Sequence, residues 1–293
     1  MKTKKRTTPR LDRYTEVLIR AALVEDLGPG DITTDAVVPR GTQGSASIVA
    51  KQPLIVCGLS VAGRVFASVD RRLCFTPLAK DGARVRKGAV IAKVEGGLRG
   101  ILSGERVALN FLQKLSGVAT LTSEFVKKAG KRGPRILDTR KTTPCMRILE
   151  KYAVKTGGGE NHRLGLFDAV LIKDNHITAA GGVGKALDAV KKRYRGKVSV
   201  EVETKSLQEV REALHAGADL IMLDNMGVAK IKKAMALIGE RALVEVSGGI
   251  TLENVGEVSR SGVDFISVGG LTHSAPAVDI SLKVTRCTPG KSK

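Results

Sequence analysis

Cationic side chains stand directly after short apolar runs of the sequence. Thr139, Arg140 and Lys141 follow the run RILD (135–138), and Lys173 closes a second apolar run. A guanidinium grips a carboxylate or phosphate through paired hydrogen bonds, and an ammonium acts as a compact point charge. These positions predict a binding site for an anionic ligand.

A glycine triplet leads into two further candidates. The segment GGGENHR (157–163) places His162 and Arg163 shortly after three glycines, ahead of the strand candidate AVLIK (169–173) that ends in Lys173. Glycines let backbone N–H groups approach a ligand closely. Alone, the triplet is more typical of a flexible loop. Followed by His and Arg, it is equally well explained as part of the anion site.

Two carboxylates form an opposing set on consecutive strand candidates. Glu203 closes VSVEVE (198–203), and Asp224 closes DLIMLD (219–224). Such a pair can serve as general acid and base, or can hold a divalent cation through oxygen ligands. The residues themselves leave both roles open.

Paired glycines follow the last two strand candidates, ALVEVS (242–247) and DFISVG (264–269). Many barrels bind a phosphate at this place through backbone amides and a helix N-terminus. The sequence therefore predicts a phosphate-binding rim, whose residues are Ser247, Gly248, Gly249, Val268, Gly269 and Gly270.

The elements that must position these groups alternate in type. From about residue 135, aliphatic or β-branched runs alternate with helical patterns such as 207–217 and 228–239. Alternating strands and helices imply a parallel sheet. Six such units favour a (β/α) barrel over an open doubly wound sheet, because no GxGxxG follows an early strand. The strand ends of a barrel share one rim, where we expect the candidate residues to meet.

The first part of the chain has a different pattern. Residues 11–27 have helical spacing, and residues 44–96 predict short strands with one helix at 61–69. Residues 101–130 predict two helices separated at Gly117. We expect a small α/β unit ahead of the barrel.

Composition excludes several classes of protein. The chain of 293 residues is 42% hydrophobic, but it has no uninterrupted apolar run of the roughly 20 residues that cross a bilayer. Its four cysteines lack CxxC spacing, which favours reduced thiols over a zinc site or a disulfide framework. No apolar secretory core follows the basic first residues, so we expect a cytoplasmic protein without a membrane segment.

The net charge of +20 is concentrated in segments such as 1–10 and 191–197. A basic balance can attract nucleic acid, or can simply form a solvated surface. With 3% aromatic residues and no reading module, the solvated surface is favoured, and nucleic acid is not the expected partner.

The motifs together resemble those of the carboxylating nicotinate-nucleotide pyrophosphorylases, also called quinolinate phosphoribosyltransferases. The resemblance extends from about residue 25 to residue 284. The motifs that carry it, in the family's order, are GERVALNFLQKLSG, DTRKTTP, KYAVKTGGGENHR, LIKDNH, VEVET, LDNM and VSGGI.

The resemblance implies an architecture. An N-terminal α/β sandwich domain would span residues 1–117, with residues 274–293 packing back on it. An open (β/α) barrel of about seven strands would span residues 118–273. The family forms homodimers with shared active sites, and the sequence leaves open whether such dimers assemble into hexamers.

The resemblance also implies an activity, in the synthesis of NAD. Quinolinate and phosphoribosyl pyrophosphate would yield nicotinate mononucleotide, pyrophosphate and CO₂, with Mg²⁺ as cofactor. Arg106, in GERVALN, would enter the partner subunit's site and bind a quinolinate carboxylate. Arg140, His162 and Arg163 would complete this anion pocket.

The remaining roles are carried over in the same way. Lys141 and Lys173 would face carboxylate, phosphate and pyrophosphate groups, beside Thr139. Glu203 and Asp224 would serve the ribose hydroxyls, directly or through Mg²⁺, and these two acids and two lysines are the catalytic candidates. The glycine-rich rim would hold the 5-phosphate.

Three other functions compete with this prediction. One is a related phosphoribosyltransferase with another acceptor, against which the intact TRK, NHR and EVE motifs argue. A second is a nucleic-acid-binding protein. The third is a phosphate-binding barrel without catalysis, which has no need of two acids on adjacent strands.

Overall fold

The computed structural model describes residues 13–289, and the basic segment 1–10 lies outside this range. Two compact units make up the chain: Met1–Leu121 with Ala275–Lys293, and Thr122–Ser274. Helix α4 (Leu98–Ala129) begins in the first unit and ends in the second. Among residues 13–289, no helix has the length and apolar character needed to cross a membrane.

The first unit is built on an antiparallel sheet of order β12-β1-β5-β3. Its C-terminal strand β12 pairs with β1 from Gln43↔Thr288 to Ala50↔Ile280, so the chain's last strand completes its first sheet. A second, two-stranded sheet joins β2 to β4. The strands are β1 (Gln43–Ala50), β2 (Leu54–Ile55), β3 (Cys74–Pro77), β4 (Arg84–Val85), β5 (Val90–Gly97) and β12 (Ile280–Thr288).

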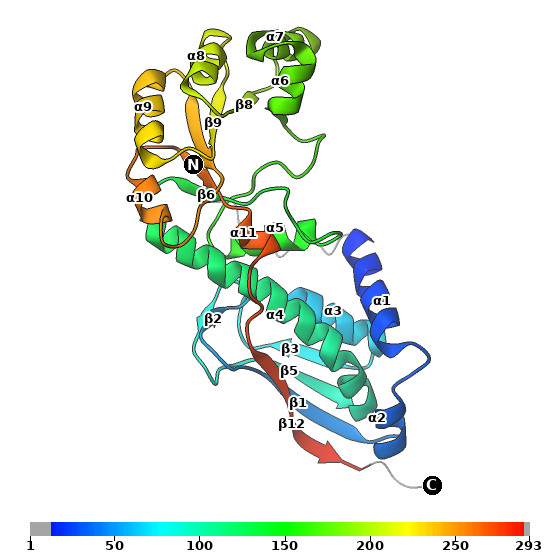
Figure 1. Ribbon diagram of the computed structural model, residues 1–293. Coiled ribbons are helices and arrows are strands. Elements are labelled where there is room, and N and C mark those ends of the chain that lie inside the picture. The colour runs from blue at the N-terminus through cyan, green and yellow to red at the C-terminus, as the bar shows by residue number, and fades with distance from the viewer. Residues whose placement is uncertain (1–12, 290–293) are drawn as a thin grey trace. The chain divides into compact units, whose positions relative to one another are not determined.

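Helices of the first unit lie on one face of this sheet (Figure 1). They are α1 (Arg13–Leu27), α2 (Ile32–Val37), α3 (Leu59–Val69) and the first part of α4. The α3 ring of Phe66 stacks on Phe75 of β3 with centroids 6.0 Å apart. The predicted α/β sandwich is confirmed, since helices cover the four-stranded sheet of this unit.

The predicted break at Gly117 is wrong, because α4 continues through it over 32 residues. A Cβ at Gly117 would lie 2.1 Å from the carbonyl oxygen of Pro276. The glycine is therefore required by close packing within the first unit, and it costs the helix only about 1 kcal/mol relative to alanine.

The second unit is the predicted parallel barrel. Its sheet has the order β6-β11-β10-β9-β8-β7, and every pairing in it is parallel. The described strands leave β6 and β7 unpaired with each other, so the barrel is open there. Six strands form the sheet where about seven were expected, and Glu160 adds an isolated parallel bridge to Leu137 at its edge. The strands are β6 (Arg135–Leu137), β7 (Val170–Ile172), β8 (Val200–Thr204), β9 (Leu220–Asp224), β10 (Leu243–Ser247) and β11 (Phe265–Ser267).

Strand β8 shows why its sequence suits a barrel. Val200 and Val202 are buried, as expected for the strand face that packs against helices. Glu201 and Glu203 alternate with them and are also buried, on the face that looks into the barrel. The strand therefore carries carboxylates into the interior at a spacing of two residues.

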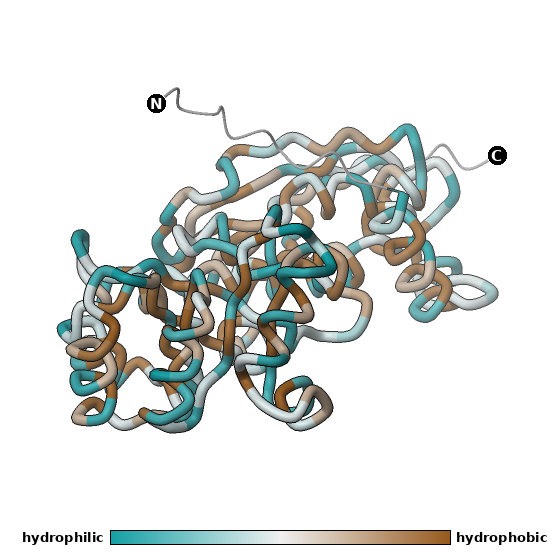
Figure 2. The backbone as a smooth tube through the Cα atoms, turned by 90° about the horizontal axis from the view of Figure 1, so that it is seen from above, coloured by the Kyte–Doolittle hydropathy of each residue, from teal (hydrophilic) through white to brown (hydrophobic). Residues whose placement is uncertain are grey.

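Helices connect the barrel strands, and hydrophobic and hydrophilic residues alternate along them (Figure 2). Helix α8 begins at a capped position, because the Ser206 hydroxyl accepts a hydrogen bond of 3.1 Å from the Glu209 N–H. The helices are α5 (Arg147–Thr156), α6 (Asp174–Ala180), α7 (Val183–Tyr194), α8 (Leu207–His215), α9 (Val228–Ile238), α10 (Val255–Ser259) and α11 (Gly270–His273).

Candidate active site

The carboxyl ends of the barrel strands surround a cavity of about 680 Å³. Fourteen of the candidate residues predicted from the sequence line it, which leaves Arg106 as the exception. The lining candidates are Thr139, Arg140, Lys141, His162, Arg163, Lys173, Glu203, Asp224, Ser247, Gly248, Gly249, Val268, Gly269 and Gly270.

Arg106 belongs to the first unit, where its side chain is exposed on α4. Its role in the site of a partner subunit stays a prediction.

Two arginines form the cationic end of the cavity. The Nε atoms of Arg140 and Arg163 are both buried, and neither has a hydrogen-bond partner within residues 13–289. Burial, and then the charge of Arg140, lowers the pKa of Arg163. Two neighbouring guanidiniums with unpaired buried N–H groups are suited to an anionic ligand that bonds to both.

A buried polar network holds the segments that carry these arginines. Lys151, on α5, is ion-paired with Asp138 at the end of β6, and its ammonium also donates to the His162 carbonyl over 2.9 Å. Asp138 accepts the His162 N–H over 2.9 Å and a hydrogen bond from the Asn161 amide. Burial raises the pKa of Asp138 and lowers that of Lys151, so desolvation opposes the charges that the ion pair and hydrogen bonds favour. Lys151 was not among the residues predicted from the sequence.

The acidic side of the cavity contains both predicted carboxylates. The Lys173 ammonium is paired with Glu203, whose side chain is 10% exposed. Asp224 accepts a hydrogen bond of 3.0 Å from the Asn225 amide. Charges of both signs therefore line one cavity, as the sequence predicts.

Asn225 also shapes the glycine-rich rim. Its backbone is left-handed, with φ of 53°, and its N–H donates to the Ser247 carbonyl over 2.8 Å. Gly248 is left-handed as well, with φ of 89°, and a Cβ there would lie 2.3 Å from the Asn225 Oδ1. A glycine is thus required at 248 by both backbone and packing.

Further lining residues were not singled out in the sequence. His273 lies three residues after Gly270, and its Nε2 would be 3.1 Å from a Cβ at Gly269. The apolar side chains of the wall suit the faces of a flat aromatic ring, and they are Leu171, Met222 and Ile250. In the sequence, only their position in the strands and turns of the rim could have indicated that they line the cavity.

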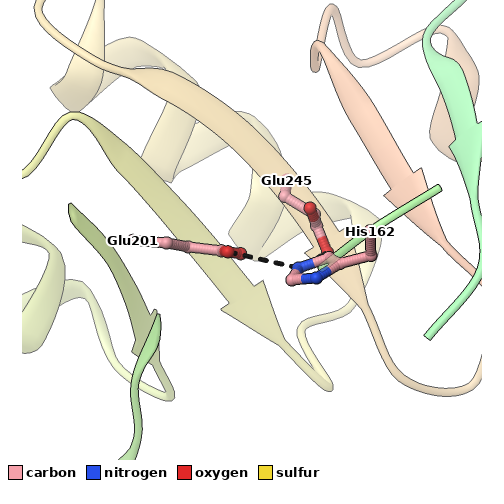
Figure 3. Close-up of side chains that lie close together, drawn as sticks. All are labelled: His162, Glu201 and Glu245. Carbon is pink, nitrogen blue, oxygen red and sulfur yellow. Dashed lines mark ion pairs between the residues drawn. The ribbon is translucent and has the colours of Figure 1, made fainter. Parts of the chain in front are cut away.

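Beneath the cavity, His162 meets two buried carboxylates (Figure 3). Its Nε2 lies 3.2 Å from Glu201 Oε2 and 3.7 Å from Glu245 Oε1. Burial disfavours the imidazolium, but the Glu201 hydrogen bond and the charges of Glu245 and Glu201 outweigh this and raise the pKa of His162. Burial, followed by the charge of Glu201, raises the pKa of Glu245 to about 7.

Fold and cavity together define a class of protein: a (β/α)-barrel enzyme with paired arginines, paired acids and a glycine-rich rim for a phosphorylated, anionic substrate. Comparison with known families identifies the group within that class. The C-terminal domain of quinolinate phosphoribosyl transferases matches residues 118–283, and their N-terminal domain matches residues 31–116. The chain belongs to the quinolinate phosphoribosyl transferase family.

Individual relatives agree with this assignment. A mitochondrial quinolinate phosphoribosyltransferase (decarboxylating) of Nicotiana glauca is 45% identical over 91% of this chain and 81% of its own. A probable nicotinate-nucleotide pyrophosphorylase (carboxylating) of Bacillus subtilis is 43% identical over 92% of each chain. The crystal structure of NadC from Streptococcus pyogenes is 40% identical, with a TM-score of 0.91 over 97% of this chain and 99% of that one. The predicted family, fold and pentosyltransferase activity are confirmed.

Proposed function

We propose that the cavity transfers a phosphoribosyl group from phosphoribosyl pyrophosphate to quinolinate, as the first step toward nicotinate mononucleotide. The activity is that of a carboxylating nicotinate-nucleotide pyrophosphorylase of NAD synthesis. The observation that carries the proposal is the gathering of Arg140, Arg163, Glu203 and Asp224 around one cavity with the glycine-rich rim.

Each end of the cavity suits one part of the substrates. Arg140 and Arg163 bind the quinolinate carboxylates, because their buried Nε atoms need acceptors. Arg106 of a second subunit adds a further cation. Lys141 and Lys173 contact carboxylate, phosphate and pyrophosphate groups, near Thr139. The rim from Ser247 to Gly249 and from Val268 to Gly270 holds the 5-phosphate through backbone N–H groups.

The chemistry follows from this placement. The pyridine nitrogen attacks C1 of the ribose as pyrophosphate leaves, and no base is needed because that nitrogen carries no proton. Positive charge develops on the ribose ring, where Glu203 and Asp224 stabilise it. The nitrogen then becomes cationic and accepts the electron pair left at C2, so the 2-carboxylate leaves as CO₂. Positioning of the two substrates supplies much of the acceleration.

The acids also fit a magnesium ion shared with substrate. Within residues 13–289, three metal-binding side chains gather only at His162, Glu201 and Glu245, so Glu203 and Asp224 offer two oxygen ligands rather than a full set. Mg²⁺ is commonly held by one or two carboxylates together with substrate phosphates. When bound, it would neutralise charge on the pyrophosphate leaving group.

The same proposal includes a homodimer with shared sites in the cytoplasm. The loop that joins α5 to β7 (157–169) carries Arg163 and is called the Arg163 loop. Its residues Leu166 and Phe167 are 73% and 84% exposed, which is typical of a surface that another chain covers. Sedimentation velocity distinguishes the dimer from a hexamer. The four free cysteines suit a reducing compartment.

The test is an assay with quinolinate labelled in its 2-carboxylate. Purified protein with phosphoribosyl pyrophosphate and Mg²⁺ should release labelled CO₂ and form nicotinate mononucleotide in equal amounts. Reactions without phosphoribosyl pyrophosphate, or with nicotinate as acceptor, are the controls. Equal turnover of nicotinate, or no CO₂ release, would overturn the assignment of quinolinate.

A further inference from the structure

We propose that Glu201 is a positioning residue of the quinolinate site, which, backed by Glu245, holds the His162 ring and so fixes the Arg163 loop. The proposal rests on the function proposed above. It concerns residues that lie below the cavity lining, since neither carboxylate lines the cavity itself.

The two carboxylates lie one layer beneath the reacting groups. Glu201 precedes Glu203 by two residues on β8, and Glu245 precedes Ser247 by two residues on β10. Alternate residues of a strand face the same side, so both acids face the barrel interior under the cavity floor. Glu245 is fully buried and Glu201 is 7% exposed.

The hydrogen bonds of His162 fix its tautomer. The Arg163 N–H donates to His162 Nδ1 over 2.7 Å, and this bond, which only an unprotonated Nδ1 can accept, opposes the imidazolium that the two carboxylates favour. The ring proton is therefore on Nε2, which donates to Glu201 over 3.2 Å. Both ring nitrogens are occupied within the protein, and His162 links the Arg163 backbone to a strand across the barrel (Figure 3).

A metal ion is the alternative occupant of this cluster, because the three ligand atoms lie within 4.8 Å of one another. A histidine that binds a metal through Nε2 carries its proton on Nδ1 and donates it to an acceptor. Here Nδ1 faces an N–H group instead. The cluster is thus built to hold an imidazole rather than a cation.

This link matters because the Arg163 loop crosses the open side of the barrel. Arg163 lies between β6 and β7, whose edges do not pair within the described strands. Its guanidinium is fixed at one end by a hydrogen bond of 3.1 Å to the Ala169 carbonyl. The imidazole adds a second attachment, from the backbone of the same residue to β8.

Substitution of Glu201 separates positioning from charge. Removal of a negative charge near a site for a dianion should by itself strengthen binding. Positioning predicts the opposite for Glu201→Met, in which His162 loses its acceptor: the KM for quinolinate should rise about tenfold. Glu201→Gln keeps a carbonyl acceptor and should retain the wild-type KM. The KM for phosphoribosyl pyrophosphate should stay unchanged in both variants.

His162 gives an independent pair of variants. The Gln amide can reach the position of Nε2 and donate to Glu201, whereas Asn is too short, so His162→Gln should keep a lower quinolinate KM than His162→Asn. Asp264→Asn, which lies just before β11 at the opposite end of the barrel, is the matched control, since the Asp264 carboxylate accepts the Val244 N–H over 2.8 Å and does not line the cavity. It should leave both KM values unchanged.

Two results would overturn the inference while leaving the function intact. One is a quinolinate KM in folded Glu201→Met that is equal to or lower than that of an active wild type. The other, decisive if Glu201→Met does not fold, is an equal quinolinate KM in His162→Gln and His162→Asn. A wild type that does not convert quinolinate contradicts the proposed function instead. Zinc or manganese should not raise the Tm of the wild type, and a rise that Glu201→Met abolishes would favour the metal site.

Discussion

The ammonium of Lys151 and the carboxylate of Asp138 form a buried ion pair, with 5% and 0% of their side chains exposed. Asp138 directly follows β6 and precedes Thr139 and Arg140, and it also accepts hydrogen bonds from the His162 N–H and the Asn161 amide. One ion pair therefore joins the two chain segments that carry the cations of the anion pocket.

Replacing Lys151 with methionine should destabilise the protein strongly. The change leaves the Asp138 carboxylate buried without its cation, which typically costs about 3–5 kcal/mol. Urea unfolding followed by circular dichroism measures the loss. Asp70→Asn, which breaks the exposed pair with Arg72, is the control and should change the unfolding free energy little. Equal losses in the two variants would contradict a structural role for the buried pair.

The strand-end residues were predictable from the sequence because their signal is local. Each apolar run ends in a polar or glycine residue, and a parallel barrel brings all such ends to one rim. Arg140, Lys173, Glu203 and Asp224 could therefore be assigned to one site from the sequence alone.

The supporting residues were not predictable, because their signal is tertiary. Lys151 is a charged residue on a helix, and only the fold shows that Asp138 lies against it. Glu201 and Glu245 alternate with valines along their strands, a pattern typical of solvent-facing residues, although both side chains face inward toward His162. Gly117 wrongly predicted a break between two helices, because glycine usually interrupts a helix. Here the helix continues, and the glycine makes room for the backbone of Pro276.

Asn225 should be required for the affinity of the phosphoribosyl donor. Asn225→Asp keeps a residue that tolerates the left-handed backbone but replaces the amide donor to Asp224 with a second negative charge. We expect the KM for phosphoribosyl pyrophosphate to rise about tenfold. Steady-state kinetics measure it. Asn225→Gly, which relieves the backbone but removes the donor, should show a smaller rise, and an unchanged KM in Asn225→Asp would contradict the role.

Gly248→Ala should be more harmful than Gly249→Ala. Both glycines are left-handed, but only at Gly248 would a Cβ collide with the Asn225 side chain, because nothing lies within 4 Å of a Cβ at Gly249. Phosphoribosyl pyrophosphate binding, measured by calorimetry, should be weaker in Gly248→Ala. Equal affinities in the two variants would show that the contact with Asn225 is unimportant.

Removal of magnesium should abolish turnover without loosening the fold. Glu203 and Asp224 offer two oxygen ligands, so the ion depends on substrate phosphates to complete its coordination. EDTA should stop CO₂ release, and added Mg²⁺ should restore it. The Tm of the substrate-free protein should be the same with and without EDTA, and a large drop would indicate a structural metal instead.

Mixed dimers test the proposed contribution of Arg106 to a partner's site. Arg106→Ala and Arg140→Ala should each be nearly inactive, since each removes a cation from every site. In a mixed dimer, one of the two sites regains both arginines. A one-to-one mixture should therefore recover about a quarter of wild-type activity. Absence of recovery after verified subunit exchange would place Arg106 outside the shared site.

Glu245 should make quinolinate binding depend on pH. Burial and the charge of Glu201 raise its pKa to about 7 from an ordinary value of 4.5, against the opposing effects of His162, Ser267 and Lys173. The folded protein holds this proton more tightly than the unfolded chain does. Stability from this group is therefore full below about pH 4.5 and is lost as the pH rises toward 7.

The same proton controls charge beneath the anion pocket. Above pH 7 the carboxyl becomes negative and repels a dianionic substrate, so the KM for quinolinate should rise from pH 6 to pH 8. Glu245→Gln resembles the protonated acid and cannot ionise, so its quinolinate KM should vary less over this range. Both carboxylates of quinolinate stay charged from pH 6 to pH 8. A difference between the two KM profiles therefore comes from ionisation of the enzyme. If the quinolinate KM of the wild type and of Glu245→Gln depends on pH in the same way, Glu245 does not ionise between pH 6 and pH 8.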